Sequence, residues 1–195
     1  MSVTSVMLAG VGGQGTILAG DVLAKVAAAS GLDVKLSEVH GMSQRGGSVD
    51  TVVRFGEQVP SPVIDVAGAD HLVAFEIIEA ARSLPFLRPG GRLLVNTRMI
   101  PPLPVLVGAQ PAPTGLVDIL DREGAVLVDA EGVACQHASA KSANVVLLGA
   151  LSVGLPFPEE LWRDVIASRV PPKSVEANLA AFAAGRAACA RGECE

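Results

Sequence analysis

Residues 3–15 read VTSVMLAGVGGQG, an apolar run that leads directly into a glycine-rich loop. The run predicts a buried strand over residues 3–9, because a short continuous apolar stretch fits a strand that is covered on both faces. The loop follows the pattern G-x-G-x-x-G. A helix is predicted next, over residues 14–29, where apolar residues recur at helical spacing. Strand, glycine loop and helix in this order begin an α/β fold.

The first glycine loop, Gly10-Val11-Gly12-Gly13-Gln14-Gly15, is suited to an anionic ligand. Glycines let a backbone approach a phosphate closely, and the following helix directs unpaired N–H groups and a positive dipole end at the same place. We therefore predict binding residues at Gly10, Gly12, Gly13, Gln14 and Gly15. A dinucleotide site also needs an acid about 20 residues later, a position that Glu38 fits loosely. The alternative is that the glycines only allow close packing of the helix on the strand.

The rest of the chain alternates predicted strands and helices. Further strands are expected over residues 33–39, 71–75, 92–96 and 126–128, of which 71–75 is expected to be buried. Further helices are expected over residues 76–84, 116–122, 144–153, 159–168 and 174–191. Residues 49–55 alternate instead, which predicts a half-exposed antiparallel strand. Short strand pieces are expected at residues 59–63 and, within a proline-rich connector, at 105–107. The fold class is thus α/β: a single three-layer domain over residues 1–195, with a mostly parallel sheet and an antiparallel strand near residues 49–55.

A second glycine loop follows residues 33–39 and reads His40-Gly41-Met42-Ser43-Gln44-Arg45-Gly46-Gly47. Its predicted binding residues are Ser43, Gln44, Arg45, Gly46 and Gly47. They offer a hydroxyl, an amide, a guanidinium that can bind phosphate or carboxylate through paired bonds, and exposed backbone. The alternative for the arginine is an ion pair between subunits or a cap within the loop. For His40, a loop-stabilising hydrogen bond is favoured over a general base, because no acid or nucleophile is visibly paired with it.

Composition excludes several classes of protein. Half of the residues are hydrophobic, only 3% are aromatic and the net charge is −5, so disorder, a base-stacking surface and nonspecific nucleic-acid binding are not expected. We expect a cytoplasmic protein without a membrane span, because no leader is visible and the longest apolar stretch, residues 145–155, is shorter than the ~20 residues of a span. Three scattered cysteines, without a C-x-x-C pair, predict no metal or iron–sulfur site on this chain.

The two loops together resemble the gamma domain of the 2-oxoacid:ferredoxin oxidoreductases. The similarity lies in residues 10–16 and 37–49, and it extends to residues 87–96 and 144–151. The second loop is most similar to the beta subunits of the indolepyruvate ferredoxin oxidoreductases. The resemblance implies oxidative decarboxylation of a 2-oxoacid, transfer of the acyl group to coenzyme A, and delivery of electrons to ferredoxin.

The resemblance also implies where the cofactors lie. Thiamine diphosphate, magnesium and iron–sulfur clusters are expected on a larger alpha subunit, because this chain has neither a cluster-binding cysteine set nor a Gly-Asp-Gly…Asn motif. Coenzyme A is the expected co-substrate, ferredoxin an indirect partner, and both glycine loops would lie at the boundary with the larger subunit. Self-association of the isolated chain as a homodimer is left open.

Two other functions remain open on the residues alone. One is a free-standing NAD(P)-binding oxidoreductase that uses residues 10–15 and Glu38; the other is a non-catalytic nucleotide-binding or assembly module. The alternating segment 49–55 counts against the first, because it interrupts the strand–helix–strand order that a dinucleotide fold requires. No catalytic residue is assigned.

Overall fold

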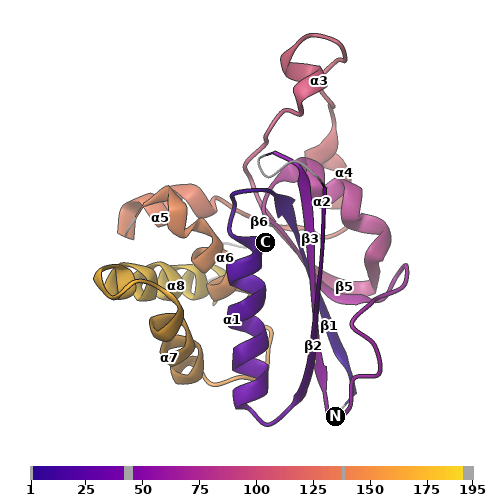
Figure 1. The fold of residues 1–195 in the computed structure, drawn as a ribbon. Helices are drawn as coiled ribbons and strands as arrows, with labels where there is room; N and C mark the ends of the chain where they lie inside the picture. The colour runs from indigo at the N-terminus through magenta and orange to yellow at the C-terminus, as the bar shows by residue number, and fades with distance from the viewer. Residues whose placement is uncertain (1, 42–45, 138, 191–195) are drawn as a thin grey trace.

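The computed structural model describes residues 2–41, 46–137 and 139–190. Within them, six strands form one mixed sheet in the order β2-β3-β1-β4-β5-β6 (Figure 1). Strands β1, β4, β5 and β6 are parallel to one another, and β3 is antiparallel to both of its neighbours, β1 and β2. The strand bounds are β1 Thr4–Val11, β2 Asp33–His40, β3 Ser48–Gly56, β4 Ala69–Ala74, β5 Leu87–Asn96 and β6 Val126–Val128. The predicted fold class is confirmed, including the antiparallel strand.

Helices cover both faces of the sheet and make three layers (Figure 1). One face carries α1 (Thr16–Ala29), α5 (Ala130–His137), α6 (Ala143–Ser152), α7 (Glu159–Arg169) and α8 (Val175–Ala190). The other carries α2 (Ile77–Ser83) and α4 (Leu116–Arg122). Short helical turns are η1 (Leu84–Phe86), α3 (Leu103–Leu106), η2 (Ala140–Ser142) and η3 (Pro172–Ser174). No helix in the described ranges is long and apolar enough to span a bilayer.

Each face of the sheet has its own hydrophobic core because side chains alternate along a strand. In β1, Val6 and Leu8 pack under the larger helical layer, while Met7 and Ala9 pack under α2 and α4. The larger core contains Trp162, the only tryptophan of the chain, which is fully buried. Its ring lies 6.1 Å from that of Phe157 and 6.0 Å from that of Phe182. Trp162 is therefore a built-in fluorescent reporter of global unfolding.

Helices α6 and α8 approach each other closely through two glycines. A Cβ atom added to Gly149 would collide with the carbonyl oxygen of Phe182, and one added to Gly185 would collide with the carbonyl oxygen of Val146. Both obstacles are backbone atoms of the facing helix. Glycine at these two positions is therefore what lets the backbones pack together.

Two strand predictions around β3 are wrong. Residues 59–63 form no strand; Pro60 and Pro62 lack the N–H groups that pairing needs, and the carbonyls of Ser61 and Val63 instead accept hydrogen bonds from the Arg54 guanidinium at 2.7 and 2.8 Å. The same contacts cover Arg54. On the same side of the strand, Val52 is buried in the core under α2 and α4. Strand β3 is therefore buried or partly buried along its whole length rather than half-exposed.

Two helical elements also differ from prediction. Residues 105 and 106 belong to α3 and residue 107 is its C-cap, so none of the three is in a strand. Pro102 precedes α3, its carbonyl accepts from the Val105 N–H at 2.9 Å, and proline suits the start of a helix. Helix α5 was not predicted. A signal for it exists in Asp129, whose side chain accepts a hydrogen bond from the Gly132 N–H at 2.9 Å, as a helix N-cap does.

Candidate functional site

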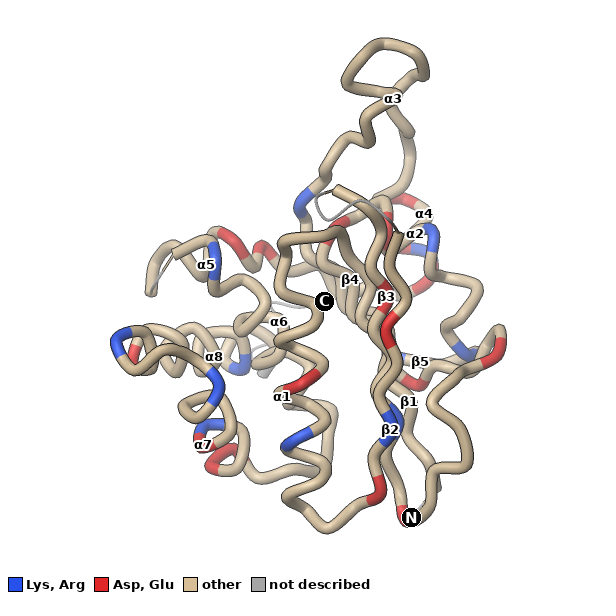
Figure 2. The backbone as a smooth tube through the Cα atoms, viewed as in Figure 1, with Lys and Arg blue, Asp and Glu red and all other residues tan. Residues whose placement is uncertain are grey.

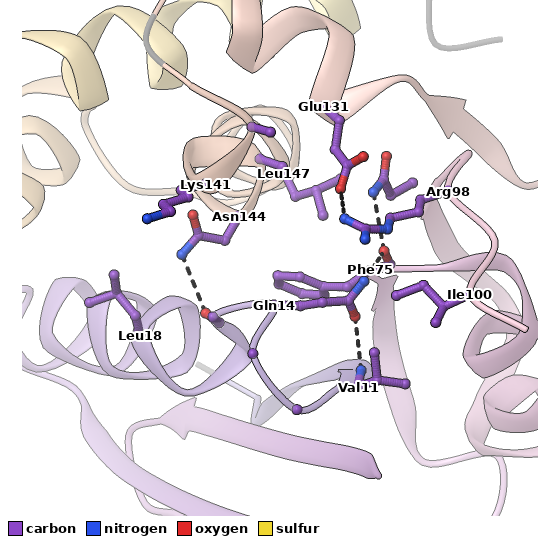
Figure 3. Close-up of a pocket in the computed structure, with 16 residues that line it drawn as sticks. Val11, Gln14, Leu18, Phe75, Arg98, Ile100, Glu131, Lys141, Asn144 and Leu147 are labelled. Atoms are coloured by element: carbon purple, nitrogen blue, oxygen red, sulfur yellow. Dashed lines mark hydrogen bonds and ion pairs between the residues drawn. The ribbon is translucent and has the colours of Figure 1, made fainter. Parts of the chain in front are cut away.

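A cavity of about 530 Å³ opens at the carboxyl ends of β1, β4 and β5 (Figure 3). The chain leaves β1 toward α1 on one face of the sheet and leaves β4 toward α2 on the other. Adjacent parallel strands whose connections diverge in this way open a crevice between them, and ligands of open α/β sheets bind there. The walls are residues 11–15, the end of β5 and residues 98–100, and parts of α5, η2 and α6.

The first glycine loop forms one wall and presents the start of α1. Gly13 and Gly15 have φ angles of 98° and 81°, in the left-handed region that favours glycine. No side chain caps the helix at Gly15, and its carbonyl accepts the first intrahelical bond, from Ala19 N–H at 3.0 Å. The N–H groups of residues 16–18 therefore have no acceptor within the helix. They form a positive end that suits an anion.

The predicted residues of this loop have different roles. Gly12, Gly13, Gln14 and Gly15 line the cavity, whereas Gly10 does not. A Cβ atom on Gly10 would lie 2.8 Å from the Gln14 side-chain oxygen and 2.9 Å from Thr16 Cγ2. For Gly10, close packing is the reason that glycine is required.

The Gln14 side chain connects the first glycine loop to the end of β4 through hydrogen bonds (Figure 3). Its Oε1 accepts from the Val11 N–H at 2.8 Å, and its Nε2 donates to the Phe75 carbonyl at 3.0 Å. The buried Asn96 extends the network: its Nδ2 donates to the same carbonyl at 3.1 Å, and its Oδ1 accepts from the Ala130 N–H at 3.1 Å. Both amides thus hold the ends of β1, β4, β5 and β6 in fixed positions around the cavity.

The second glycine loop adjoins the first. The Gly12 N–H donates to the Gly47 carbonyl at 2.9 Å, because the pairing of β1 with β3 places Val11 opposite Ser48. Gly46 is exposed and has a φ of 74°; neither it nor Gly47 lines the cavity. The other predicted residues of this loop, Ser43, Gln44 and Arg45, lie outside the described residues.

The remaining candidates lie away from the cavity. His40 is exposed, and its Nδ1 lies 3.1 Å from the Gly41 carbonyl, a contact of the loop-stabilising kind expected for it. Glu38 is exposed on β2, and β3 separates β2 from β1. A ribose-binding acid would have to stand beside the first loop, so Glu38 does not complete a dinucleotide site.

Three charged residues not predicted from the sequence line the opposite wall (Figure 3). Arg98 follows β5 and forms an ion pair with Glu131 of α5. Lys141, on η2, contributes an ammonium group that is exposed at the cavity. Arg98 and Glu131 could have been found from their positions after β5 and β6. Residues that follow the carboxyl ends of parallel strands meet at one edge of the sheet.

Two acidic side chains outside the cavity lining, Glu76 and Asp50, have pKa values that burial raises. Glu76, directly after Phe75, is 1% exposed and accepts a hydrogen bond from the Ile100 N–H at 3.3 Å and another from the Glu79 N–H. Asp50 of β3 has a pKa raised by burial and further by the nearby Glu79 carboxylate. Glu79 itself binds Arg82 at 3.0 Å and the Ser48 hydroxyl at 2.5 Å.

The chemistry available at the cavity is that of binding. Its described lining contains no histidine, cysteine, serine or threonine, and its one carboxylate, Glu131, is ion-paired. Within the described ranges, no group of three or more His, Cys, Asp and Glu side chains is arranged to hold a metal ion. The arrangement offers backbone donors and a lysine to an anionic ligand without an acid–base pair.

Comparison with known proteins places this arrangement in a family. The sequence profile described as pyruvate ferredoxin/flavodoxin oxidoreductase matches residues 5–188. The chain belongs to the pyruvate ferredoxin/flavodoxin oxidoreductase family. Within it, the chain is 39% identical over 188 residues to indolepyruvate oxidoreductase subunit IorB of Thermococcus kodakarensis, covering 93% of both chains. It is 30% identical to ketoisovalerate oxidoreductase subunit VorA of Methanothermobacter marburgensis, but there it covers 92% of this chain and 35% of the longer relative.

Solved structures of the family share the fold. The gamma subunit of a keto/oxoacid ferredoxin oxidoreductase from Geobacter sulfurreducens superposes with a TM-score of 0.71 at 25% identity, covering 96% of this chain and 99% of that one. The 2-oxoglutarate:ferredoxin oxidoreductase from Magnetococcus marinus, with 2-oxoglutarate, coenzyme A and succinyl-CoA bound, gives a TM-score of 0.76 at 23% identity. It matches 98% of this chain over 32% of its own length. The same α/β unit therefore occurs both as a separate subunit and within longer chains.

Proposed function

We propose that this chain is the smaller, accessory subunit of a 2-oxoacid:ferredoxin oxidoreductase that acts on indolepyruvate or a similar aryl pyruvate. The observation that carries the proposal is the 39% identity to an IorB subunit across 93% of both chains. Relatives named for ketoisovalerate and 2-oxoglutarate are 30% and 31% identical. The difference in identity favours the aryl substrate over the aliphatic ones.

The site supports an accessory role. The resemblance to the 2-oxoacid:ferredoxin oxidoreductases implies thiamine diphosphate for the carbanion chemistry and iron–sulfur clusters for the electrons that pass to ferredoxin. A cluster needs four thiolates, and no suitable ligand group occurs in the described ranges. We assign these cofactors, with magnesium and the contact to ferredoxin, to the larger alpha subunit. The complex is assigned to the cytoplasm, which keeps thiols such as Cys135 reduced.

Within the complex, the cavity is proposed to face the larger subunit and to bind an anionic part of coenzyme A. The start of α1, with the N–H groups of residues 16–18, lies at one wall, and Lys141 lies at the other. Glu131 neutralises Arg98, so the lysine and the helix end supply the positive potential. A phosphate group of coenzyme A matches both donors in charge and in hydrogen-bonding capacity.

The test is an assay of the assembled enzyme. The chain is co-expressed with its larger subunit, and ferredoxin reduction is followed with indolepyruvate, pyruvate, 2-oxoglutarate and ketoisovalerate, each with and without coenzyme A. The expected result is coenzyme A-dependent reduction with the highest kcat/KM for indolepyruvate and no turnover by either subunit alone. Equal kcat/KM values for the aliphatic acids would reject the substrate assignment.

A second measurement addresses the alternative function. Titration calorimetry of the isolated chain with NAD and NADP is expected to show no binding, because Glu38 lies two strands from the first glycine loop. Micromolar affinity for either nucleotide would instead favour a free-standing dehydrogenase.

A further inference from the structure

An uncharged segment projects from the body of the molecule beside the cavity. Residues 99–117 read MIPPLPVLVGAQPAPTGLV and contain no Lys, Arg, Asp or Glu. We call residues 99–115 the apolar arm. Figure 2 shows it extending past the sheet edge with α3 at its tip, and without a charged residue beyond its base. None of residues 97–119 is buried.

The apolar arm exposes large aliphatic side chains. Leu103, Leu106 and Val107 are 70%, 68% and 67% exposed, and Met99 at the base is 41% exposed. Scattered single exposed apolar residues are ordinary, but several on one projecting element mark a surface for another protein. A stretch this apolar would ordinarily be covered.

The tip is a defined structure and not an extended loop. The Leu106 N–H donates to the Pro102 carbonyl at 3.1 Å, and the Ala109 N–H donates to the Pro104 carbonyl at 2.8 Å. Five prolines between residues 101 and 113 restrict the backbone further. Ordering this segment on a partner therefore costs little conformational entropy, which is the property of a pre-organised binding element.

The base of the apolar arm is continuous with the cavity. Ile100 lines the cavity, and its N–H donates to the buried Glu76 carboxylate at 3.3 Å. The backbone just before the arm is also fixed, because the Arg98 carbonyl accepts a hydrogen bond from the Ile77 N–H at 2.9 Å. The base of the apolar arm is therefore part of the cavity wall, and a protein bound along the arm would lie next to the cavity.

The relatives indicate which protein that is. IorB subunits match this chain over nearly their whole length, whereas VorA contains the same unit as 35% of a longer chain. In VorA the unit is covalently joined to the neighbouring part of that longer chain. A separate subunit must hold the corresponding neighbour by a surface, and an uncharged aliphatic element next to the ligand cavity is the surface that this chain offers.

We infer that the apolar arm is the element by which this chain docks into an aliphatic pocket of the larger oxidoreductase subunit, with Leu103 and Leu106 as its anchors. The inference rests on the proposed function, since it takes the larger subunit as partner. Anchoring side chains of this kind contribute a large share of the binding energy of an interface.

The test measures the dissociation constant between the purified chain and the larger subunit. The double variant Leu103→Asp/Leu106→Asp places charges on the tip, and we expect a Kd at least about tenfold higher than that of the unmodified chain. The matched control is Val63→Asp/Val66→Asp, because these residues are 65% and 70% exposed on the segment between β3 and β4. The control is expected to keep the original Kd, and both isolated variants the original Tm.

Three results would overturn the inference, and each has a different consequence for the proposed function. If the unmodified chain binds the larger subunit and the arm variant binds equally well, the arm is not the docking element although the proposed function stands. If the arm variant alters only the mass of the isolated chain in solution, the occupant is a second copy of this chain. If the unmodified chain does not bind the larger subunit at all, the proposed function fails together with the inference.

Discussion

The side-chain Nδ2 of Asn144 donates a 3.4 Å hydrogen bond to the carbonyl oxygen of Gly15, which joins two residues 129 positions apart in the chain. The contact seats the start of α6 on the start of α1, at the wall of the cavity. Gly15 has a φ of 81°, and a Cβ atom there would lie 2.6 Å from the same Nδ2. Backbone conformation and space therefore both require glycine at this position.

Comparison of Gly15→Ala with Gly13→Ala separates these two requirements. Gly13 also has a positive φ, 98°, but a Cβ atom there would meet nothing within 4 Å. We expect Gly13→Ala to lower the free energy of unfolding by about 1–2 kcal/mol through backbone strain alone, and Gly15→Ala to lower it by about 1–3 kcal/mol more through the clash. Urea denaturation followed by Trp162 fluorescence measures both.

A third variant identifies the source of the extra cost. Adding Asn144→Ala to Gly15→Ala removes the colliding amide, so the double variant should lose less than the sum of the single losses. Strict additivity would show that the collision is not what makes Gly15 necessary.

Substitution of Gly185 tests the contact between α6 and α8 by the sign of its effect. Intrinsic helix propensity alone predicts that Gly185→Ala stabilises the chain by about 1 kcal/mol. The Val146 carbonyl occupies the space that the new methyl group needs, and overpacking of this kind costs about 1–3 kcal/mol or more. We expect a net loss of unfolding free energy in thermal or urea denaturation.

The control for that experiment lies on the same helix. Ala187→Gly, at a partly buried position of α8, should cost only the propensity difference of about 1 kcal/mol. An increase in stability for Gly185→Ala would mean that the two helices can separate without loss.

Much of the fold could be predicted because local patterns and tertiary environment agree. The apolar run of β1 and the helical spacing in α1 reflect real burial. Asp21 and Lys25, four positions apart on α1, also form the ion pair at 2.8 Å that this spacing favours. The residues around β3 show the limit. The alternation in residues 49–55 gave the correct antiparallel direction, but no local pattern shows that residues 61 and 63 would return to cover Arg54.

Of the candidate site, only the wall formed by the first glycine loop could be predicted from the sequence. Glycines after a strand carry a local signal, so residues 12–15 of the cavity wall were found. Arg98 and Glu131 are 33 positions apart and meet only because β5 and β6 are adjacent and parallel. Pairing of this kind depends on strand order, and the insertion of β3 between β1 and β2 was not visible in the sequence.

Asp50 should make stability depend on pH. Burial, followed by the Glu79 carboxylate, raises the pKa of Asp50, so the folded state binds this proton more tightly than the unfolded state. The contribution to stability is therefore present at low pH and is lost as pH rises from the ordinary value of 3.8 through the raised pKa. Asp50→Asn removes this loss. Its unfolding free energy relative to the unmodified chain should increase between pH 3.5 and pH 7 (about the span over which carboxyl groups titrate).

The same denaturation series on Asp118→Asn controls for the removal of a negative charge, because Asp118 is exposed on α4. A difference between Asp50→Asn and the unmodified chain that does not vary with pH would show that burial of Asp50 has no effect on its titration.

Lys141→Ala should weaken the binding of coenzyme A to the assembled enzyme. The loss of one solvent-accessible charged contact is expected to raise the KM for coenzyme A by about 3- to 10-fold, with a smaller effect at high ionic strength because salt screens the interaction. The kcat is expected to change little, since the lysine is assigned to binding. Steady-state kinetics at two salt concentrations measures this.

Lys173→Ala is the matched control for that experiment, because Lys173 is an exposed lysine on η3, away from the cavity lining. An unchanged KM for coenzyme A in Lys141→Ala, at low salt, would remove the lysine from the proposed binding site.

The donors at the start of α1 belong to the main chain, and this has a consequence for how the family diversifies. No side-chain replacement can delete an N–H group short of proline, so a substitution that preserves the backbone conformation also preserves these donors. Relatives that bear the names of chemically different oxoacids can inherit the wall unaltered. Preference among those acids is then free to evolve on other surfaces of the assembly.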